Sequence, residues 1–145
     1  MTAIGRPGLY SATVLMILLS SLTCFAETVE LDPRVMARFE KGQKLFDKGA
    51  YFESNAIFEE VLEASPDFTE AHYFLGLGYQ KLGAFDKSVG PLEKAVVQEK
   101  NFLAAKYALG LSYANLGREK EARALLLVVV EEQPEHKFAL FLLST

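Results

Sequence analysis

Cysteine, histidine and clustered positive charge are all scarce in this 145-residue chain. The sequence has one cysteine, Cys24, and two histidines, His72 and His136, with no second histidine or cysteine at ligand spacing. This scarcity argues against a metal site. The formal net charge is -4 and no run of lysines and arginines occurs. The composition therefore argues against a nucleic-acid-binding surface, which needs a clustered basic face.

Residues suited to catalysis are also few. Each glycine is explained by a helix end or a helix contact, so no phosphate-binding loop is predicted. The adjacent carboxylates Glu59-Glu60 and Glu131-Glu132 are expected on exposed helix ends, as solvated surface rather than as an acid/base pair. We therefore predict no catalytic residue, no bound metal and no cofactor, and a protein that is not an enzyme.

The first 26 residues differ in composition from the rest. They contain a single charged side chain, Arg6, an apolar centre from Leu9 to Leu19, and a small-residue end at Cys24-Phe25-Ala26. This pattern is typical of a secretory signal peptide cleaved after Ala26, so residues 1–26 are predicted to be the signal. The apolar stretch is shorter than the roughly 20 residues that span a bilayer. A retained membrane anchor and a lipid-modified Cys24 are the alternatives.

Cleavage after Ala26 would remove the only cysteine. The mature protein would then have no disulfide and no thiol, and packing alone would stabilise it in an oxidising compartment. We expect a periplasmic or secreted protein of the bacterial envelope, with no stable membrane span after cleavage.

The remaining chain repeats with a period of 34 residues. A glycine, a bulky residue, a second glycine and a small residue recur at fixed offsets. The matched sets are Gly42, Gly76 and Gly110; Leu45, Tyr79 and Tyr113; Gly49, Gly83 and Gly117; Ser54, Ser88 and Ala122; Phe58, Leu92 and Leu126; Val61, Ala95 and Val129. A fixed period of this length predicts a repeat array.

Each period predicts a helix, a glycine, a second helix and a turn, and no segment has the pattern of a strand. Asp32-Pro33 has the pattern of a helix start, with Asp as N-cap and Pro at the first helical position. Glycines 49, 83 and 117 are expected to end helices in the left-handed conformation. The expected helices span residues 35–48, 51–64, 70–82, 85–99, 103–116, 119–132 and 137–143. Pro91 is expected to bend the helix that contains it.

These spacings resemble those of the tetratricopeptide repeat family. The best matches are Leu75-Gly76, Tyr79, Gly83, Phe85, Leu92 and Ala95, then Leu109-Gly110, Tyr113, Gly117, Ala122 and Pro134. The resemblance implies an all-α solenoid of three helix-turn-helix repeats plus a C-terminal helix. The repeats would span residues 35–68, 69–102 and 103–136, after a lead-in at 27–34 and before the C-terminal helix at 137–145. Arg38, His72 and Lys106 depart from the family by replacing a large aromatic residue.

Close packing of two helices would explain why glycine recurs inside the first helix of each repeat. Glycine inside a helix costs about 1 kcal/mol relative to alanine unless a close approach needs it. We expect Gly42, Gly76 and Gly110 to face the small residues Ser54, Ser88 and Ala122 of the second helices. Larger residues, among them Tyr79 and Leu92, would fill the spaces between hairpins, so that the array is stabilised by nearest-neighbour stacking.

The resemblance also implies a function. In the family the first helix of each repeat lines a concave groove that holds a peptide or a partner helix. The corresponding positions here are Met36, Phe39, Gln43 and Phe46; Glu70, Tyr73, Leu77 and Gln80; Ala104, Tyr107, Leu111 and Ala114, continued by Phe138 and Phe141. The predicted partner-binding residues are Phe39, Phe46, Tyr73, Leu77, Tyr107, Leu111 and Phe141.

Aromatic residues recur at the fifth position of these helices, as Phe39, Tyr73, Tyr107 and Phe141. A solvent-facing row of this kind indicates an interaction site; packing inside a tight superhelix is the alternative. The basic and amide residues with which some family members clamp a C-terminal carboxylate are absent. We therefore predict a non-catalytic scaffold that binds a protein or peptide with apolar or aromatic side chains.

The C-terminal sequence KFALFLLST supports a second hypothesis, which is self-assembly. Solenoids normally end in a helix with a polar outer face, whereas this segment is apolar nearly all round. It could pair with a second copy of the chain to form a homodimer, or the reading frame could be a shortened one.

Overall fold

The computed structural model describes residues 31–144, which form seven helices and no strand. The helices are α2 (Pro33–Asp47), α3 (Tyr51–Ala64), α4 (Thr69–Lys81), α5 (Phe85–Gln98), α6 (Leu103–Asn115), α7 (Glu119–Glu132) and α8 (Lys137–Ser144). Each lies within about two residues of the range expected from the sequence. The predicted signal peptide, with its anchored and lipid-modified alternatives, lies outside the described residues. The all-α prediction is confirmed for the part of the chain that the structure describes.

Local capping chemistry explains where the helices begin and end. The Asp32 carboxylate accepts a hydrogen bond from the Arg34 backbone N–H at 2.8 Å, with Pro33 at the first helical position as predicted. After α2 the chain turns through Gly49 at φ 80°, and the Ala50 N–H bonds the Leu45 carbonyl at 2.9 Å. Positive φ recurs at glycines 83 and 117. This geometry is a glycine-terminated helix end, and it confirms the predicted left-handed glycines.

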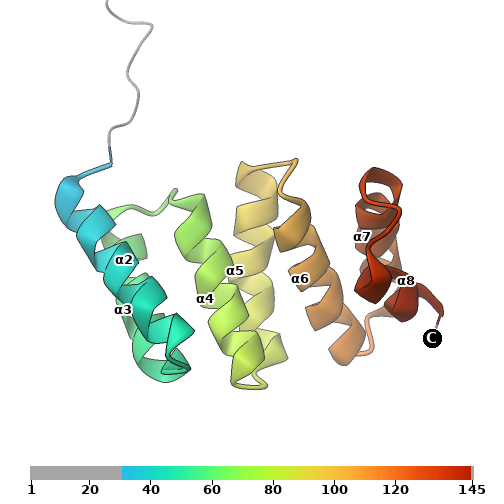
Figure 1. Ribbon diagram of the computed structural model, residues 1–145, viewed down its shortest axis with the longest axis horizontal. Coiled ribbons are helices and arrows are strands. Elements are labelled where there is room, and N and C mark those ends of the chain that lie inside the picture. The colour runs from blue at the N-terminus through green and yellow to red at the C-terminus, as the bar shows by residue number, and fades with distance from the viewer. Residues whose placement is uncertain (1–30, 145) are drawn as a thin grey trace, which may run out of the picture. The chain divides into compact units, whose positions relative to one another are not determined.

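The helices form three successive hairpins, α2–α3, α4–α5 and α6–α7, followed by α8 (Figure 1). Each helix packs against the next one in the chain, and the first helices of neighbouring hairpins also meet. The second helices do not: no Cα atom of α3 lies within 8 Å of one in α5, nor one of α5 within 8 Å of α7. The second helices of neighbouring hairpins are therefore farther apart than the first helices.

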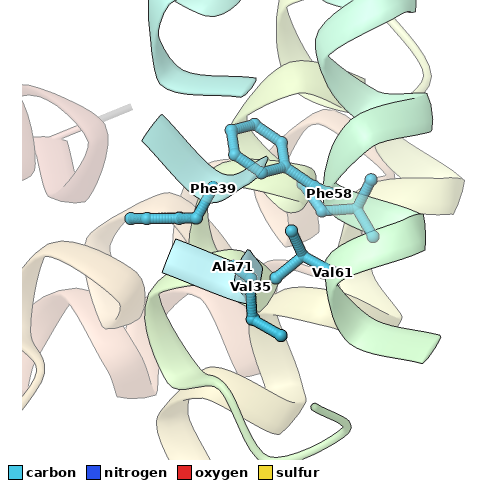
Figure 2. Close-up of a cluster of buried hydrophobic side chains, with 6 residues drawn as sticks. Val35, Phe39, Phe58, Val61 and Ala71 are labelled. Atoms are coloured by element: carbon cyan, nitrogen blue, oxygen red, sulfur yellow. The ribbon is translucent and has the colours of Figure 1, made fainter. Parts of the chain in front are cut away.

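The buried core follows the array in three clusters. The first joins Val35 and Phe39 of α2, Phe58 and Val61 of α3, and residues of α4 (Figure 2). The second centres on Leu92, Leu109 and Tyr113, and the third on Leu126, Val129 and Ala139. The first two clusters take side chains from two hairpins each, and the third joins the last hairpin to α8, as nearest-neighbour stacking requires.

The repeated glycines do lie where two helices meet, but the nearest side chain to each is larger than predicted; only Gly110 has its predicted partner among the nearest atoms, with the Ala122 carbonyl oxygen 3.5 Å from an added Cβ. A Cβ added at Gly42 would lie 2.7 Å from the Phe58 ring, and one at Gly76 would lie 2.5 Å from Leu92 Cγ. At Gly110 the nearest atom is Leu126 Cγ, at 3.1 Å. The glycines thus accommodate the large residues one turn beyond Ser54, Ser88 and Ala122. The two buried serines instead bond to carbonyls of their own helices.

Candidate functional site

A pocket of about 230 Å³ lies between α4 and α6. Its wall combines predicted groove positions of the second and third hairpins with residues from the start of α6 and the turn before α8. The lining residues are Tyr73, Leu77, Gln80, Leu103, Ala104, Tyr107, Ala108, Gln133 and His136. Of the seven predicted partner-binding residues, the structure therefore brings three, Tyr73, Leu77 and Tyr107, to one place. We refer to it as the α4/α6 pocket.

Helix periodicity explains how these side chains converge. Tyr73, Leu77 and Gln80 are spaced by four and then three residues, so they form one stripe along α4. Ala104 and Tyr107 are three apart on α6, and they lie on the side of that helix that faces the stripe. The repeat period thus places two first helices with matching faces on either side of the pocket.

The two tyrosines of the pocket are fixed by ring contacts. The Tyr73 ring centroid lies 4.7 Å from that of Phe102, and the Tyr107 centroid lies 4.6 Å from the His136 ring. Both tyrosines are half-buried, and burial raises the pKa of each phenol above its ordinary value. Both hydroxyls are consequently protonated at neutral pH and can donate a hydrogen bond to a ligand.

His136 is a pocket residue that sequence reasoning missed. The ring is half-buried against Tyr107. Its Nδ1 accepts a hydrogen bond from the Ala139 backbone N–H at 3.1 Å, which caps the start of α8. Since Nδ1 is an acceptor, the neutral ring carries its proton on Nε2. The three-residue spacing to Ala139 was the available signal.

Gln80 connects the pocket to the core. Its Nε2 donates to the Ala108 carbonyl and to Ser112 Oγ, each at 2.6 Å. The amide is thus held against α6, and it fixes the separation of the two helices that form the pocket.

The other predicted residues lie elsewhere. Phe39 is only 6% exposed, with its ring against Phe58, Phe68 and Phe74, so the packing alternative applies to this position. Phe46 is half-buried and packs edge-on against Tyr51 and Phe74. These two phenylalanines belong to the core at the first hairpin because three helices deliver aromatic rings to the same place.

Leu111 and Phe141 do not line the α4/α6 pocket either. Leu111 is half-buried on α6. Phe141 lies on α8 and is 65% exposed. The predicted aromatic row therefore changes along the array from core, at the first hairpin, to pocket, and then to open surface.

The chemistry of the pocket is neutral. None of its lining residues is Asp, Glu, Lys or Arg. Within residues 31–144 no three His, Cys, Asp or Glu side chains gather so that they could hold a metal ion. In the same part of the chain, no helix has the length and apolar character needed to cross a membrane.

Part of the chain matches a known protein family in sequence. Residues 79–137 match the profile of the tetratricopeptide repeat family. No curated protein sequence matches the chain.

Several solved structures share the fold. The first TPR domain of Spaghetti (RPAP3) bound to the HSP90 peptide SRMEEVD aligns with a TM-score of 0.72 at 23% identity, over 76% of this chain and 87% of that one. The Arabidopsis OM64 TPR domain gives 0.73 at 18% identity, over 77% and 92%.

The Yersinia enterocolitica type III secretion translocator chaperone SycD gives a TM-score of 0.69 at 15% identity, over 81% of this chain and 94% of that one. At such identities the likeness concerns the fold. Together with the repeat match, it identifies the described part of this chain as a tetratricopeptide-type α-solenoid of three helical hairpins and a C-terminal helix.

Proposed function

We propose that this protein is a non-catalytic scaffold that binds an uncharged protein or peptide segment in the α4/α6 pocket. The observation that carries the proposal is the convergence of Tyr73, Leu77 and Tyr107, with Gln80 and Ala104, around one neutral cavity. All five stand at positions where family members line a peptide groove. The RPAP3 domain with similar architecture was solved with a bound peptide, which supports a binding role.

The pocket favours an apolar or aromatic side chain flanked by peptide backbone. Leu77, Ala104 and the two tyrosine rings supply apolar area, and tyrosine gives a large contact at low entropic cost. Two phenol hydroxyls and His136 Nε2–H supply hydrogen bonds for backbone carbonyls of the ligand. An acidic C-terminal segment would find no cation in this wall to pair with its carboxylates.

We also propose that the protein works in the bacterial envelope. The support is the three-part pattern of its first 26 residues, which is that of a secreted protein. Comparing the mass of the isolated protein with that of the full chain tests this proposal: a loss equal to residues 1–26 is expected. An intact amino terminus in a cytoplasmic fraction would contradict it.

Peptide selection tests the binding role. We expect selection of random peptides against the purified protein to enrich uncharged sequences with an aromatic or large aliphatic anchor. The double variant Tyr73→Ala Tyr107→Ala should weaken their binding at least tenfold, because each tyrosine acts as an interface anchor worth about 1–2 kcal/mol. Helicity measured by circular dichroism should stay near that of the unmodified protein.

Phe52→Ala is the matched control for that experiment. Phe52 is an aromatic residue of α3, 77% exposed and outside the α4/α6 pocket. It should leave peptide binding unchanged. Equal loss in the control and in the double variant, or no loss in the double variant, would refute the pocket as the binding site.

The exposed face of α8 supports a second candidate function, which is homodimer formation. Phe138 is 70% exposed, Phe141 65% and Leu140 43%, on a helix of eight residues. Sedimentation of the protein across a concentration range tests it. Dimers that dissociate in Phe138→Ser Phe141→Ser are expected, whereas a monomer at every concentration rules the candidate out.

A further inference from the structure

Gln80 is a pocket residue whose side-chain amide has one orientation only. Its nitrogen Nε2 lies 2.6 Å from the Ala108 carbonyl oxygen, which can accept a hydrogen bond but cannot donate one. The same nitrogen donates to Ser112 Oγ at 2.6 Å. Both N–H bonds of the amide are therefore used on α6, and the oxygen Oε1 is left as the free end of the side chain.

A chain of hydrogen bonds through the core keeps the amide in this orientation. Ser88 Oγ donates to the Phe85 carbonyl oxygen at 2.7 Å and lies 2.6 Å from Ser112 Oγ. Because the single Ser88 proton is used on that carbonyl, Ser112 is the donor between the two hydroxyls. Ser112 Oγ then accepts from Gln80. The chain runs from α5 through α6 to α4, and it ends at the Gln80 amide.

The Gln80 amide oxygen is an unused acceptor that remains accessible. Within residues 31–144 the hydrogen bonds of this side chain are those of Nε2, and none involves Oε1. The fully buried side-chain atoms without a partner in the same range belong to Asn55 and His72. Gln80 Oε1 is consequently not sealed inside the fold. Since Gln80 lines the α4/α6 pocket, this wall has an acceptor that is fixed in place and open to a ligand.

Hydrogen-bond donors stand around this acceptor in the same pocket. The hydroxyls of Tyr73 and Tyr107 can each donate to a ligand. His136 uses Nδ1 to accept from the Ala139 backbone N–H, so its neutral ring offers Nε2–H. A ligand that satisfies the wall therefore has to supply acceptors for these donors and a donor for Gln80 Oε1.

We propose that the segment bound in the α4/α6 pocket is extended and donates one backbone N–H to Gln80 Oε1. The proposal rests on the proposed function of this pocket. In an extended chain the backbone N–H and C=O groups are both free, so neighbouring groups can donate to Gln80 and accept from a tyrosine hydroxyl. In the middle of a helix each N–H is bonded to the carbonyl one turn earlier. A helix laid across the pocket therefore cannot supply the donor.

Gln80 also determines the register of the bound segment, because the amide occurs once at this repeat position. The equivalent residues are Phe46 on α2 and Ala114 on α6, whose side chains have no hydrogen-bonding atom. The contact with Gln80 therefore singles out one N–H of the ligand. Along an extended chain, that choice fixes which side chain enters the apolar part of the pocket.

Backbone ester analogues of a peptide selected against the purified protein test the proposal. Each analogue replaces one backbone N–H by an oxygen atom and keeps every side chain. At one position the ester should weaken binding about tenfold, because Gln80 Oε1 loses its donor. In the variant Gln80→Met, which lacks the acceptor, the same ester should cost less than about twofold.

Gln98→Met is the matched control, since Gln98 is an exposed glutamine of α5 outside the pocket. It should leave the tenfold cost of the ester unchanged. A second measurement needs no substitution in the protein and so does not depend on the folding of Gln80→Met. The carbonyl carbon resonance of the Gln80 side chain should shift when the all-amide peptide binds, and should shift less with the critical ester.

The outcomes separate this proposal from the proposed function. A peptide with NOEs to the rings of Tyr73 and Tyr107, but with no ester whose cost depends on Gln80, overturns the proposal and leaves the pocket as the binding site. The same holds if the NOEs within the bound peptide are those of a helix. If selection yields no peptide that binds the pocket, the proposed function and this proposal are both overturned.

Discussion

The two junctions between successive hairpins differ in how their buried polar side chains are hydrogen-bonded. Where α3 meets α4, the Asn55 side chain lies against Gly78, and neither its Nδ2 nor its Oδ1 has a hydrogen-bond partner. Where α5 meets α6, the equivalent residues are Val89 and Ser112, and Ser112 Oγ lies 2.6 Å from Ser88 Oγ. The first junction therefore buries a side-chain amide without hydrogen-bond partners, whereas the buried serine hydroxyls of the second junction are hydrogen-bonded.

The residues around the two junctions also differ. The first adjoins a cluster of phenylalanine rings, in which Phe39 lies 4.6 Å from Phe68 and 5.7 Å from Phe58 between ring centroids. The second adjoins the α4/α6 pocket through Gln80, which bonds Ser112. The comparison shows that aromatic packing stabilises one end of the array, while a hydrogen-bonded junction leaves room for a ligand beside it.

Among the substitutions that test this comparison, Gly78→Ser is expected to lower the free energy of unfolding the most. An added Cβ would lie 1.8 Å from Asn55 Oδ1, inside the buried junction. The free energy of unfolding should fall by about 3 kcal/mol, the upper part of the range for overpacking. Urea unfolding followed by circular dichroism measures it.

The double variant Asn55→Val Gly78→Ser is the matched control, because it copies Val89 and Ser112 into the first junction. It should recover most of the lost stability, which makes the two substitutions strongly non-additive. If the double variant is as unstable as Gly78→Ser alone, the two junctions are not interchangeable and the comparison is wrong.

Ser112→Ala should have the next largest effect, at the second junction. It removes the shared partner of Ser88 and Gln80. We expect a loss of about 1–2 kcal/mol in the free energy of unfolding, since buried donors lose a partner. Ser144→Ala, at an exposed hydroxyl of α8, should cause no measurable loss. An equal loss in both variants would contradict the role of the network.

The two equivalent tyrosine–glutamate bonds should have smaller and equal effects. The Tyr79 hydroxyl donates to Glu59, and Tyr113 donates to Glu93. Tyr79→Phe and Tyr113→Phe should each cost about 1 kcal/mol. Unequal losses would show that the junctions differ here too.

The same tyrosines predict a loss of stability at high pH. The bond to Glu59 raises the pKa of Tyr79 from 10.0 to about 12, and burial followed by the bond to Glu93 raises the pKa of Tyr113 to about 12. Between pH 10 and 12 the unfolded chain loses these protons before the folded one does. Their contribution is therefore complete below pH 10 and lost as the pH rises to about 12. Unfolding of the double phenylalanine variant should lack that part of the pH dependence.

His72 should give the smallest effect, visible only in acid. Burial, assisted by the positive charge of Lys94, lowers the pKa of the imidazole below 6.5 despite its bond to the Pro66 carbonyl. The unfolded chain then takes up a proton that the folded chain does not, so stability falls as the pH drops below 6.5. His72→Phe should remove this acid-dependent part in unfolding measured across that range. An unchanged acid dependence would contradict a neutral, buried His72.

Much of the fold could be predicted because the helix limits depend on residues close in sequence, and these recur with the 34-residue period. Glycine at a helix end and proline at a helix start act within a few residues, so the start of α2 at Pro33 and the ends of α2, α4 and α6 follow directly from the sequence. The partners of Gly42 and Gly76 could not be predicted in the same way. A 34-residue period fixes which residues are equivalent, but it does not decide which of two residues one turn apart reaches across to the next helix.

The candidate site was predictable in part for a similar reason. Tyr73, Leu77 and Tyr107 follow from helix periodicity and the resemblance to the family. The burial of Phe39 does not, because it depends on Phe58, Phe68 and Phe74 arriving from other helices. The contact of Asn55 with Gly78 could not be predicted either, since the residues at those two positions differ from one repeat to the next.

The most direct test of the account is the place where a selected peptide touches the protein. Intermolecular NOEs measured on the complex should connect the anchor side chain of the peptide to the rings of Tyr73 and Tyr107. NOEs confined to other surfaces, such as Phe138 and Phe141 of α8, with none to these two rings, would contradict the α4/α6 pocket as the binding site.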